Sequence, residues 1–119
     1  MLSRPEPYEA IAFTGDARRA LIDRAISVAE VRQALQAGMV LRVYPETTPT
    51  ARLLLTWTDR EATLGTYEQG RPVHVVASND DEAERTTIIT AYEPDPDRWT
   101  DQFRWNPSWT SETNTWRQP

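Results

Sequence analysis

The sequence contains no cysteine and no lysine, and it has a single histidine, His74. The absence of cysteine excludes disulfides and thiolate metal sites and agrees with a reducing compartment. All 13 basic residues are arginines, so every cation is a planar guanidinium that can donate paired hydrogen bonds to a carboxylate or a phosphate. No apolar run approaches the roughly 18 residues of a membrane span, and the first residues lack the apolar centre of a signal peptide. We therefore expect a cytoplasmic protein that does not associate with membranes.

Acidic charge is concentrated in the middle of the chain. The formal net charge is -5, yet residues 59–97 hold ten acidic residues against three arginines, while residues 1–58 and 98–119 each carry a net charge of +1. A dedicated nucleic-acid binder usually has a dominant basic face, which this composition does not indicate. The sequence also lacks the glycine motifs that bind phosphates or dinucleotides, and it lacks a histidine pair for zinc. We expect no cofactor and no metal.

Two amphipathic helices are predicted before residue 39. Residues 16–26, DARRALIDRAI, place alanine and leucine near one stripe, with charged residues outside it. The next segment begins with Ser27 and Glu30 at the spacing of a capping box, and Gly38 marks its end. Three apolar residues at helical spacing should face a sheet: Val28, Val31 and Leu35.

Four strands are predicted after the helices, near residues 39–44, 51–57, 72–78 and 86–92, because these runs are rich in β-branched and apolar residues. The last two are joined by NDDEAER, a polar connection typical of antiparallel neighbours. Their continuous apolar centres indicate that both faces of the sheet are at least partly covered. The acidic NDDE run lacks the glycine and the closing glutamate of a calcium loop, so we interpret it as a solvated turn.

A short C-terminal helix is predicted in EPDPDRWTDQF. Asp95 can cap it, Pro96 suits its first position, and Trp99 and Phe103 should pack back on the domain.

The expected organisation is one α+β domain, residues 1–105, with two N-terminal helices packed on a curved, four-stranded antiparallel sheet. Residues 106–119 are polar apart from tryptophan and have no period, and we interpret them as a loosely ordered tail. The tryptophans near the C-terminus could dock on a partner or on the chain's own sheet.

Five segments carry a family resemblance, in this order: AISVAEVRQAL, VYPE, RLLL, GRPVHVV and IITAYEPDPDRW. They resemble the bacterial family known as domain of unknown function 4258 (DUF4258). Its members have a helix pair, a Y-P-E/D strand end, an R-x-LLL strand, a G-R-P-L-H-V-V strand and a final T-V-Y-x-P-D-P-x-x-W. The similarity covers about residues 13–104.

The resemblance implies a fold similar to the RelE-like and BrnT-like toxins, in which two helices precede a curved antiparallel sheet. Family members are often taken as toxins of type II toxin–antitoxin pairs, with a small zinc-binding antitoxin as the suspected partner. Such toxins cleave RNA without a metal, using Arg, Lys, His and Tyr side chains on the concave sheet. The resemblance therefore implies an RNA substrate and a protein partner.

This chain departs from the family pattern at two places. The family often has an R-H-A box where this chain has Thr14, Gly15, Asp16 and Ala17, so any role of that histidine is lost. The connection TWTDREATLGTYEQ, between RLLL and GRPVHVV, is also long and could reshape one edge of the sheet.

Strand pairing brings candidate catalytic residues together. If the last hairpin is centred near Glu82, His74 lies opposite Thr90 or Tyr92, with both side chains on one face, and Arg71 precedes the strand at the same end. In metal-independent RNA cleavage, His74 could move a proton, Arg71 could stabilise the charge of the phosphorane, and Tyr92 could orient or stack a base. The candidate RNA-binding residues are Arg18, Arg52 and Arg98.

Each of these residues also has a structural interpretation. A lone histidine beside valines is commonly a packed residue whose ring nitrogens bond to the backbone. Tyr92 could end the sheet, Arg71 could pair with Glu93 or Asp95, and Arg52 could form a surface ion pair. Two functions therefore stay open: a toxin-like endoribonuclease, and a catalytically silent RelE-like scaffold that binds proteins.

Overall fold

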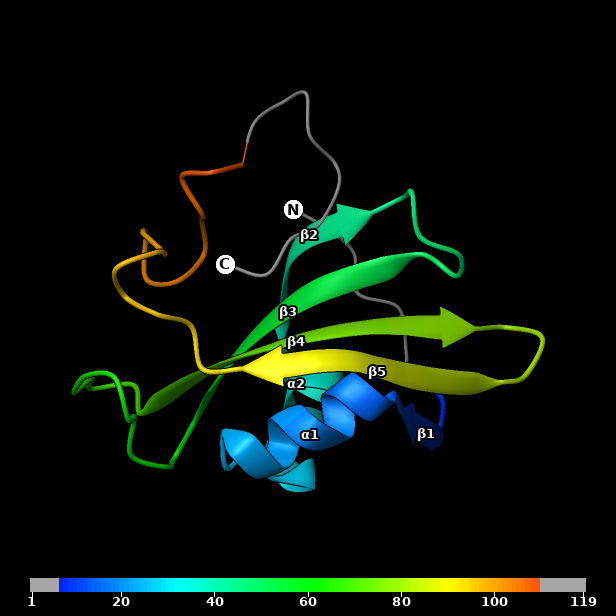
Figure 1. Cartoon of the computed structure of the whole chain (residues 1–119), viewed down its shortest axis with the longest axis horizontal. Helices are drawn as coiled ribbons and strands as arrows, with labels where there is room; N and C mark the ends of the chain where they lie inside the picture. The colour runs from blue at the N-terminus through cyan, green and yellow to red at the C-terminus, as the bar shows by residue number, and fades with distance from the viewer. Residues whose placement is uncertain (1–6, 110–119) are drawn as a thin grey trace.

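The computed structural model describes residues 7–109. Its elements, in chain order, are β1 (Ala10–Phe13), α1 (Gly15–Asp23), α2 (Val28–Ala37), β2 (Met39–Tyr44), β3 (Ala51–Thr58), β4 (Arg71–Asp80) and β5 (Arg85–Tyr92). The strands form one sheet in the order β1-β5-β4-β3-β2 (Figure 1). β1 is parallel to β5, and the other three pairs are antiparallel. None of the helices formed by the described residues is long and apolar enough to cross a membrane.

Both predicted helices are present, and their ends follow from capping side chains. The Thr14 hydroxyl accepts a hydrogen bond from the Ala17 amide and so begins α1. The predicted capping box of α2 is confirmed, because Ser27 accepts from the amide of Glu30 while the Glu30 carboxylate accepts from the amide of Ser27. Gly38 ends the helix as predicted.

The predicted inner face of α2 is wrong at one position. Val31 and Leu35 are buried, but Val28 is 45% exposed because it lies in the first turn of α2, where Glu30 takes the buried position instead. The carboxylate of Glu30 is bonded there on several sides, which offsets the cost of burying it.

Removing the cap of α2 should have a small, measurable cost. Ser27→Ala deletes the hydroxyl that accepts from the Glu30 amide and should lower the free energy of unfolding by about 1 kcal/mol. Urea denaturation monitored by circular dichroism measures this change. Ser108→Ala, at an exposed position outside any helix, is the matched control and should leave stability within about 0.5 kcal/mol of wild type. Equal effects of the two changes would contradict the capping argument.

The four predicted strands are confirmed with boundaries shifted by two residues or fewer, but the sheet has a fifth strand. β1 pairs with residues 85–88 of β5 in parallel, so the prediction of a wholly antiparallel, four-stranded sheet is wrong. A strand of four residues is too short to show an alternating pattern, and its partner lies more than 70 residues further along the chain.

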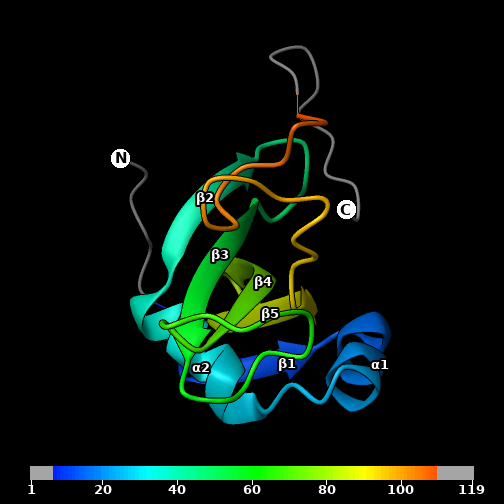
Figure 2. The same ribbon diagram turned by 90° about the vertical axis from the view of Figure 1, so that its left-hand side faces the viewer.

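The sheet is covered on both faces, which explains the unbroken apolar runs of its central strands. Val73 and Val75 of β4 join the core formed with α1 and α2, whereas Val76 joins a second core on the opposite face. The first eight residues of β4 are all buried. The helices lie on one side of the sheet, and the chain that follows β5 crosses the other side (Figure 2).

The predicted C-terminal helix is absent, and residues 94–109, here called the strap, form turns instead. Asp95 does begin a turn, because its carbonyl accepts from the amides of Arg98 and Trp99. Residues 101–103 then adopt positive φ angles of 53°, 56° and 68°, which a right-handed helix cannot contain. Trp99 and Phe103 nevertheless pack back on the sheet as predicted, with 4% and 6% of their surface exposed.

The beginning of the predicted tail is packed rather than loose. Asn106 is buried, and the ring of Trp109 lies edge-on to Trp99 with 5.2 Å between ring centroids. The guanidinium of Arg42, on β2, lies 4.6 Å from the centroid of the Trp109 ring. This tryptophan therefore docks on the chain's own sheet. The rest of the predicted tail, including Trp116, lies outside the described residues.

Candidate functional site

His74 lies at the centre of the second core, under the strap. Its side chain is 0% exposed, and its ring is edge-on to Trp99, with centroids 4.4 Å apart. Its Nε2 lies 2.8 Å from the carbonyl oxygen of Phe103, and its Nδ1 lies 3.3 Å from the hydroxyl of Tyr92. His74 pairs with Tyr92, which is one of the two partners expected from the hairpin, and not with Thr90.

These contacts define the protonation state of the ring. A carbonyl oxygen can only accept, so Nε2 carries the proton and Nδ1 accepts from Tyr92. Burial lowers the pKa of His74 to about 3, an effect that the bond to Phe103 only partly opposes. Burial likewise raises the pKa of Tyr92 far above its ordinary value. At neutral pH both groups are uncharged and bonded to each other.

This geometry favours the structural interpretation of His74. A general acid or base must reach the proton that it transfers, directly or through one water, and His74 has no exposed surface. Both of its ring nitrogens are already within hydrogen-bond distance of protein atoms. The structure thus brings two of the three predicted catalytic residues together, but in a closed core.

Arg71, the third predicted catalytic residue, is held in a buried ion cluster on the helix side of β4. Its Nε donates to Glu93 at 2.8 Å, one terminal nitrogen lies 3.5 Å from Glu30, and only 2% of its side chain is exposed. Its remaining donors reach the carbonyls of Arg24 and Ala25, at 2.6 and 2.9 Å. The pairing with Glu93 is one of the structural alternatives that the sequence left open.

Each carboxylate of the ion cluster is saturated with donors. Burial raises the pKa of Glu93, but bonds from the amides of Thr63 and Leu64 and from Arg71 outweigh it and leave the pKa lowered. Burial also raises the pKa of Glu30, but bonds from Ser27, Thr58 and Arg60, together with the charge of Arg71, outweigh it and leave the pKa lowered. The sequence did not predict this cluster, because Glu30 was interpreted only as part of the helix cap. The other residues that bond to Glu30 are distant from it in the chain.

One glycine makes the position of Arg71 possible. Gly70 has a φ of +98°, and a Cβ on it would lie 2.0 Å from the carbonyl oxygen of Thr58. Only glycine fits this close approach between the end of β3 and the start of β4.

The three predicted RNA-binding arginines do not form one surface. Arg18 is exposed on α1, and Arg98 is exposed on the strap, across the sheet. Arg52 lies on the helix side of β3 beside Leu35 and Ala77, with its Nε buried and without a hydrogen-bond partner among residues 7–109. These three arginines therefore do not form the local positive face that an acidic protein needs in order to approach RNA.

Comparison with known protein families supports the resemblance up to Glu93, a range that includes GRPVHVV but only the first three residues of AYEPDPDRW. A family model described as "Domain of unknown function (DUF4258)" matches residues 13–93. The chain belongs to this family. No curated protein and no solved structure matches it.

The matched residues end at Glu93, so the strap that covers His74 follows the matched part of the chain.

Thr14, in the region where the sequence departs from the R-H-A pattern, has a structural role. Its hydroxyl donates to the carbonyl of Ile89 at 2.8 Å and accepts from Ala17, so it ties α1 to the edge of β5.

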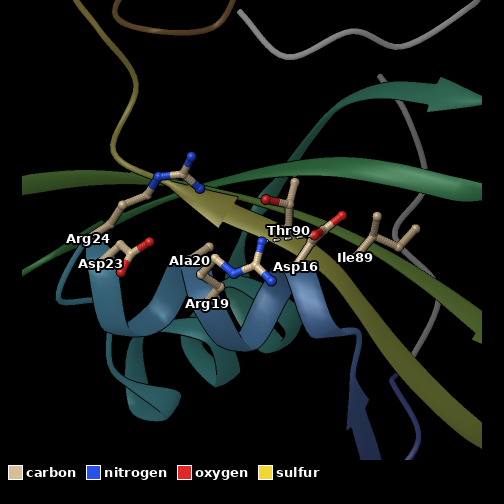
Figure 3. A pocket seen from close by; sticks show the side chains of 7 residues that line it. All are labelled: Asp16, Arg19, Ala20, Asp23, Arg24, Ile89 and Thr90. Carbon is tan, nitrogen blue, oxygen red and sulfur yellow. Dashed lines mark ion pairs between the residues drawn. The ribbon is translucent and has the colours of Figure 1, made fainter.

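A cleft of about 290 Å³ lies between α1 and β5 (Figure 3). Its lining residues are Asp16, Arg19, Ala20, Asp23, Arg24, Ile89 and Thr90. The two arginines and two aspartates balance in charge, and Arg19 lies 3.9 Å from Asp16. Arg24 donates to the carbonyl of Ala91 at 2.9 Å. No predicted catalytic residue lines this cleft, and its balanced charge offers no special attraction for a polyanion.

Proposed function

We propose that this DUF4258 domain is a catalytically silent, RelE-like scaffold that acts as a protein-binding module. The observation that carries this proposal is the complete burial of His74, with both ring nitrogens bonded and a pKa lowered to about 3. The chain has no second histidine that could replace it. A toxin-like endoribonuclease with a small zinc-binding antitoxin is the competing hypothesis, and it requires His74 to be accessible.

The remaining chemistry also supports binding over catalysis. Arg71 is bonded to two carboxylates and two carbonyls, so its guanidinium is not available to stabilise a phosphorane. Arg98 lies across the sheet from Arg18 and Arg52, and Arg52 is partly buried beside Leu35. An acidic surface repels RNA but suits a basic protein partner.

The proposal predicts that the purified full chain does not cleave RNA. Structured and single-stranded RNA, with and without ribosomes, should stay intact over hours, and induced expression should not arrest growth. His74→Gln is the diagnostic variant, because it removes the imidazole while leaving a side chain that can donate a hydrogen bond. Its melting temperature is measured alongside the cleavage assay.

Two results are decisive. Cleavage by the wild type that is lost in His74→Gln, with the melting temperature kept, would reject the proposal in favour of the nuclease. Intact RNA with both proteins, together with a lower melting temperature for the variant, is the expected result, because the histidine then contributes to packing and hydrogen bonding alone.

A further inference from the structure

Three exposed apolar residues lie on neighbouring segments at one end of the molecule. Five large hydrophobic residues are exposed in the part of the chain that the structure describes, and three of them are on α1, at the start of α2 and in the loop of residues 59–70. They are Ile22, Val28 and Leu64, with exposed fractions of 80%, 45% and 49%. Figure 2 views this end, where the turn between the helices lies beside that loop. Exposed apolar residues on neighbouring segments mark this end as a candidate interaction site.

A continuous chain of hydrogen bonds fixes the loop and the turn relative to each other. The amide of Leu64 donates to Glu93 at 2.8 Å, Arg71 donates to the same carboxylate at 2.8 Å, and Arg71 also donates to the carbonyl of Ala25 at 2.9 Å. Arg60, from the loop, donates to that same carbonyl at 2.8 Å. The two segments are therefore held by one buried cluster.

The buried ion cluster of Glu30, Arg71 and Glu93 positions the backbone segments that bond to it. Burying an ion pair contributes little net stability, because desolvation cancels much of the attraction, but a saturated pair defines one geometry. Here Glu30, Arg71 and Glu93 hold the backbone of an exposed loop and an exposed turn, while the side chain of Leu64 stays half exposed. The cluster thus presents Leu64 beside the helix turn.

The charge around these apolar side chains is negative. Four exposed acidic residues lie on the same segments: Asp23, next to Ile22 in the chain, and Asp59, Glu61 and Glu68, in the loop that carries Leu64. Of the nearby exposed arginines, Arg60 is paired with Glu30, whereas Arg24 donates to the neutral carbonyl of Ala91 and keeps its positive charge, so the four carboxylates outnumber this cation. Such a surface repels nucleic acids and anionic membranes, and it attracts cationic groups.

We propose that this end of the domain, the acidic end surface formed by Ile22, Val28, Leu64 and the four carboxylates, binds a basic amphipathic segment of a partner protein. The apolar side chains of that segment pack on the three hydrophobic residues, and its lysines or arginines meet the surrounding carboxylates. This inference rests on the proposed binding function and names the surface and the chemistry of its partner.

A synthetic helical peptide of leucine and lysine, about 18 residues long and fluorescently labelled, is the probe. Its binding to the full chain, followed by fluorescence anisotropy, should have a dissociation constant in the micromolar range and weaken as salt rises. The same helix with glutamate in place of lysine should not bind. The double variant Ile22→Ser/Leu64→Ser should weaken binding about tenfold or more, as should Asp59→Asn/Glu61→Gln.

Matched variants elsewhere on the surface control for non-specific attraction. Asp81→Asn/Glu82→Gln removes the same charge from the turn between β4 and β5, and Met39→Ser removes a side chain that is 50% exposed on β2. Both should bind the peptide as the wild type does. Equal loss of binding in these controls, or no binding by the wild type, would overturn the proposed surface.

Two further measurements separate the remaining possibilities. Concentration-dependent dimerisation in sedimentation experiments, lost in Ile22→Ser/Leu64→Ser, would show that a second copy covers this end and would overturn the peptide proposal. RNA cleavage by the wild type rejects the proposed function itself, whereas inert RNA together with absent peptide binding rejects the surface alone.

Discussion

Replacing Arg71 by methionine is expected to lower the free energy of unfolding by about 3–5 kcal/mol, the largest effect of any single change considered for this domain. Methionine keeps much of the aliphatic length but leaves Glu30 and Glu93 buried without their shared cation. The carbonyls of Arg24 and Ala25 lose a donor as well. Urea denaturation at pH 7, monitored by tryptophan fluorescence, measures the change.

The pH dependence of this loss has a definite sign. In the native protein the pKa of Glu30 and of Glu93 is lowered, so their contribution to stability is present above the ordinary value of 4.5 and is lost as pH falls through the lowered value. Without Arg71 both pKa values rise, and protonation then relieves the unpaired charge. The difference in stability between wild type and Arg71→Met should therefore shrink as pH falls from 7 to 4.

Arg60→Met is the matched control for the ion cluster. Arg60 contacts the same Glu30 oxygen at 3.0 Å, but half of its side chain is exposed, so solvent screens the pair and the loss should stay below about 1 kcal/mol. Adding Glu30→Gln and Glu93→Gln to Arg71→Met should recover part of the lost stability. Similar losses for Arg60→Met and Arg71→Met would show that burial does not distinguish the two pairs.

Much of the fold could be predicted from the sequence, because local signals determine it. Ser27 and Glu30 form a capping box whether or not the sheet is present, and the β-branched runs place the boundaries of β2 to β5 within two residues. β1 could not be predicted, because its stability comes from pairing with β5 at the far end of the chain. The sequence predicts a helix in the strap because the turn at Asp95 has helical hydrogen bonds. The residues that follow adopt positive φ angles, and their conformation depends on packing against the sheet, which local signals do not encode.

The candidate site was predictable only in part. Register arithmetic narrowed the partner of His74 to Thr90 or Tyr92, because it depends on two adjacent strands, and Tyr92 is the residue opposite it. It could not show that Trp99 and Phe103 close over the pair, since a turn of left-handed residues brings them there. The alternation of side chains along a strand places Arg71, three residues before His74, on the other face, but the strand was predicted to begin only after Arg71. The contact of Arg71 with Glu30 could not be predicted, because the partners of Glu30 are spread along the chain.

His74 should make the domain sensitive to acid over a defined range. The pKa is about 3 in the folded state against 6.5 for an exposed histidine, so below pH 6.5 the unfolded chain binds a proton that the folded chain excludes. This stability is fully present above pH 6.5 and declines by roughly 1.4 kcal/mol per pH unit toward pH 3. Between pH 7 and pH 4 the loss should amount to about 3 kcal/mol.

The variant His74→Gln separates this loss from other acid effects. Glutamine does not titrate, so the variant should be about 1–2 kcal/mol less stable than wild type at pH 7 and should lose less stability as pH falls. The two stability curves, measured by urea denaturation, should cross between about pH 5 and pH 6. Acid effects on the glutamates act on both proteins and cancel in the difference.

Tyr92→Phe is the control, because it removes the hydroxyl that donates to Nδ1 but keeps the imidazole buried. It should retain the steep dependence on pH of the wild type. Since the chain has one histidine, its imidazole proton resonances can be followed directly by NMR and should shift with a midpoint near pH 3, unless the protein unfolds first. A midpoint near 6.5 in the folded protein would mean that water reaches the ring, and it would return His74 to the list of groups able to transfer a proton.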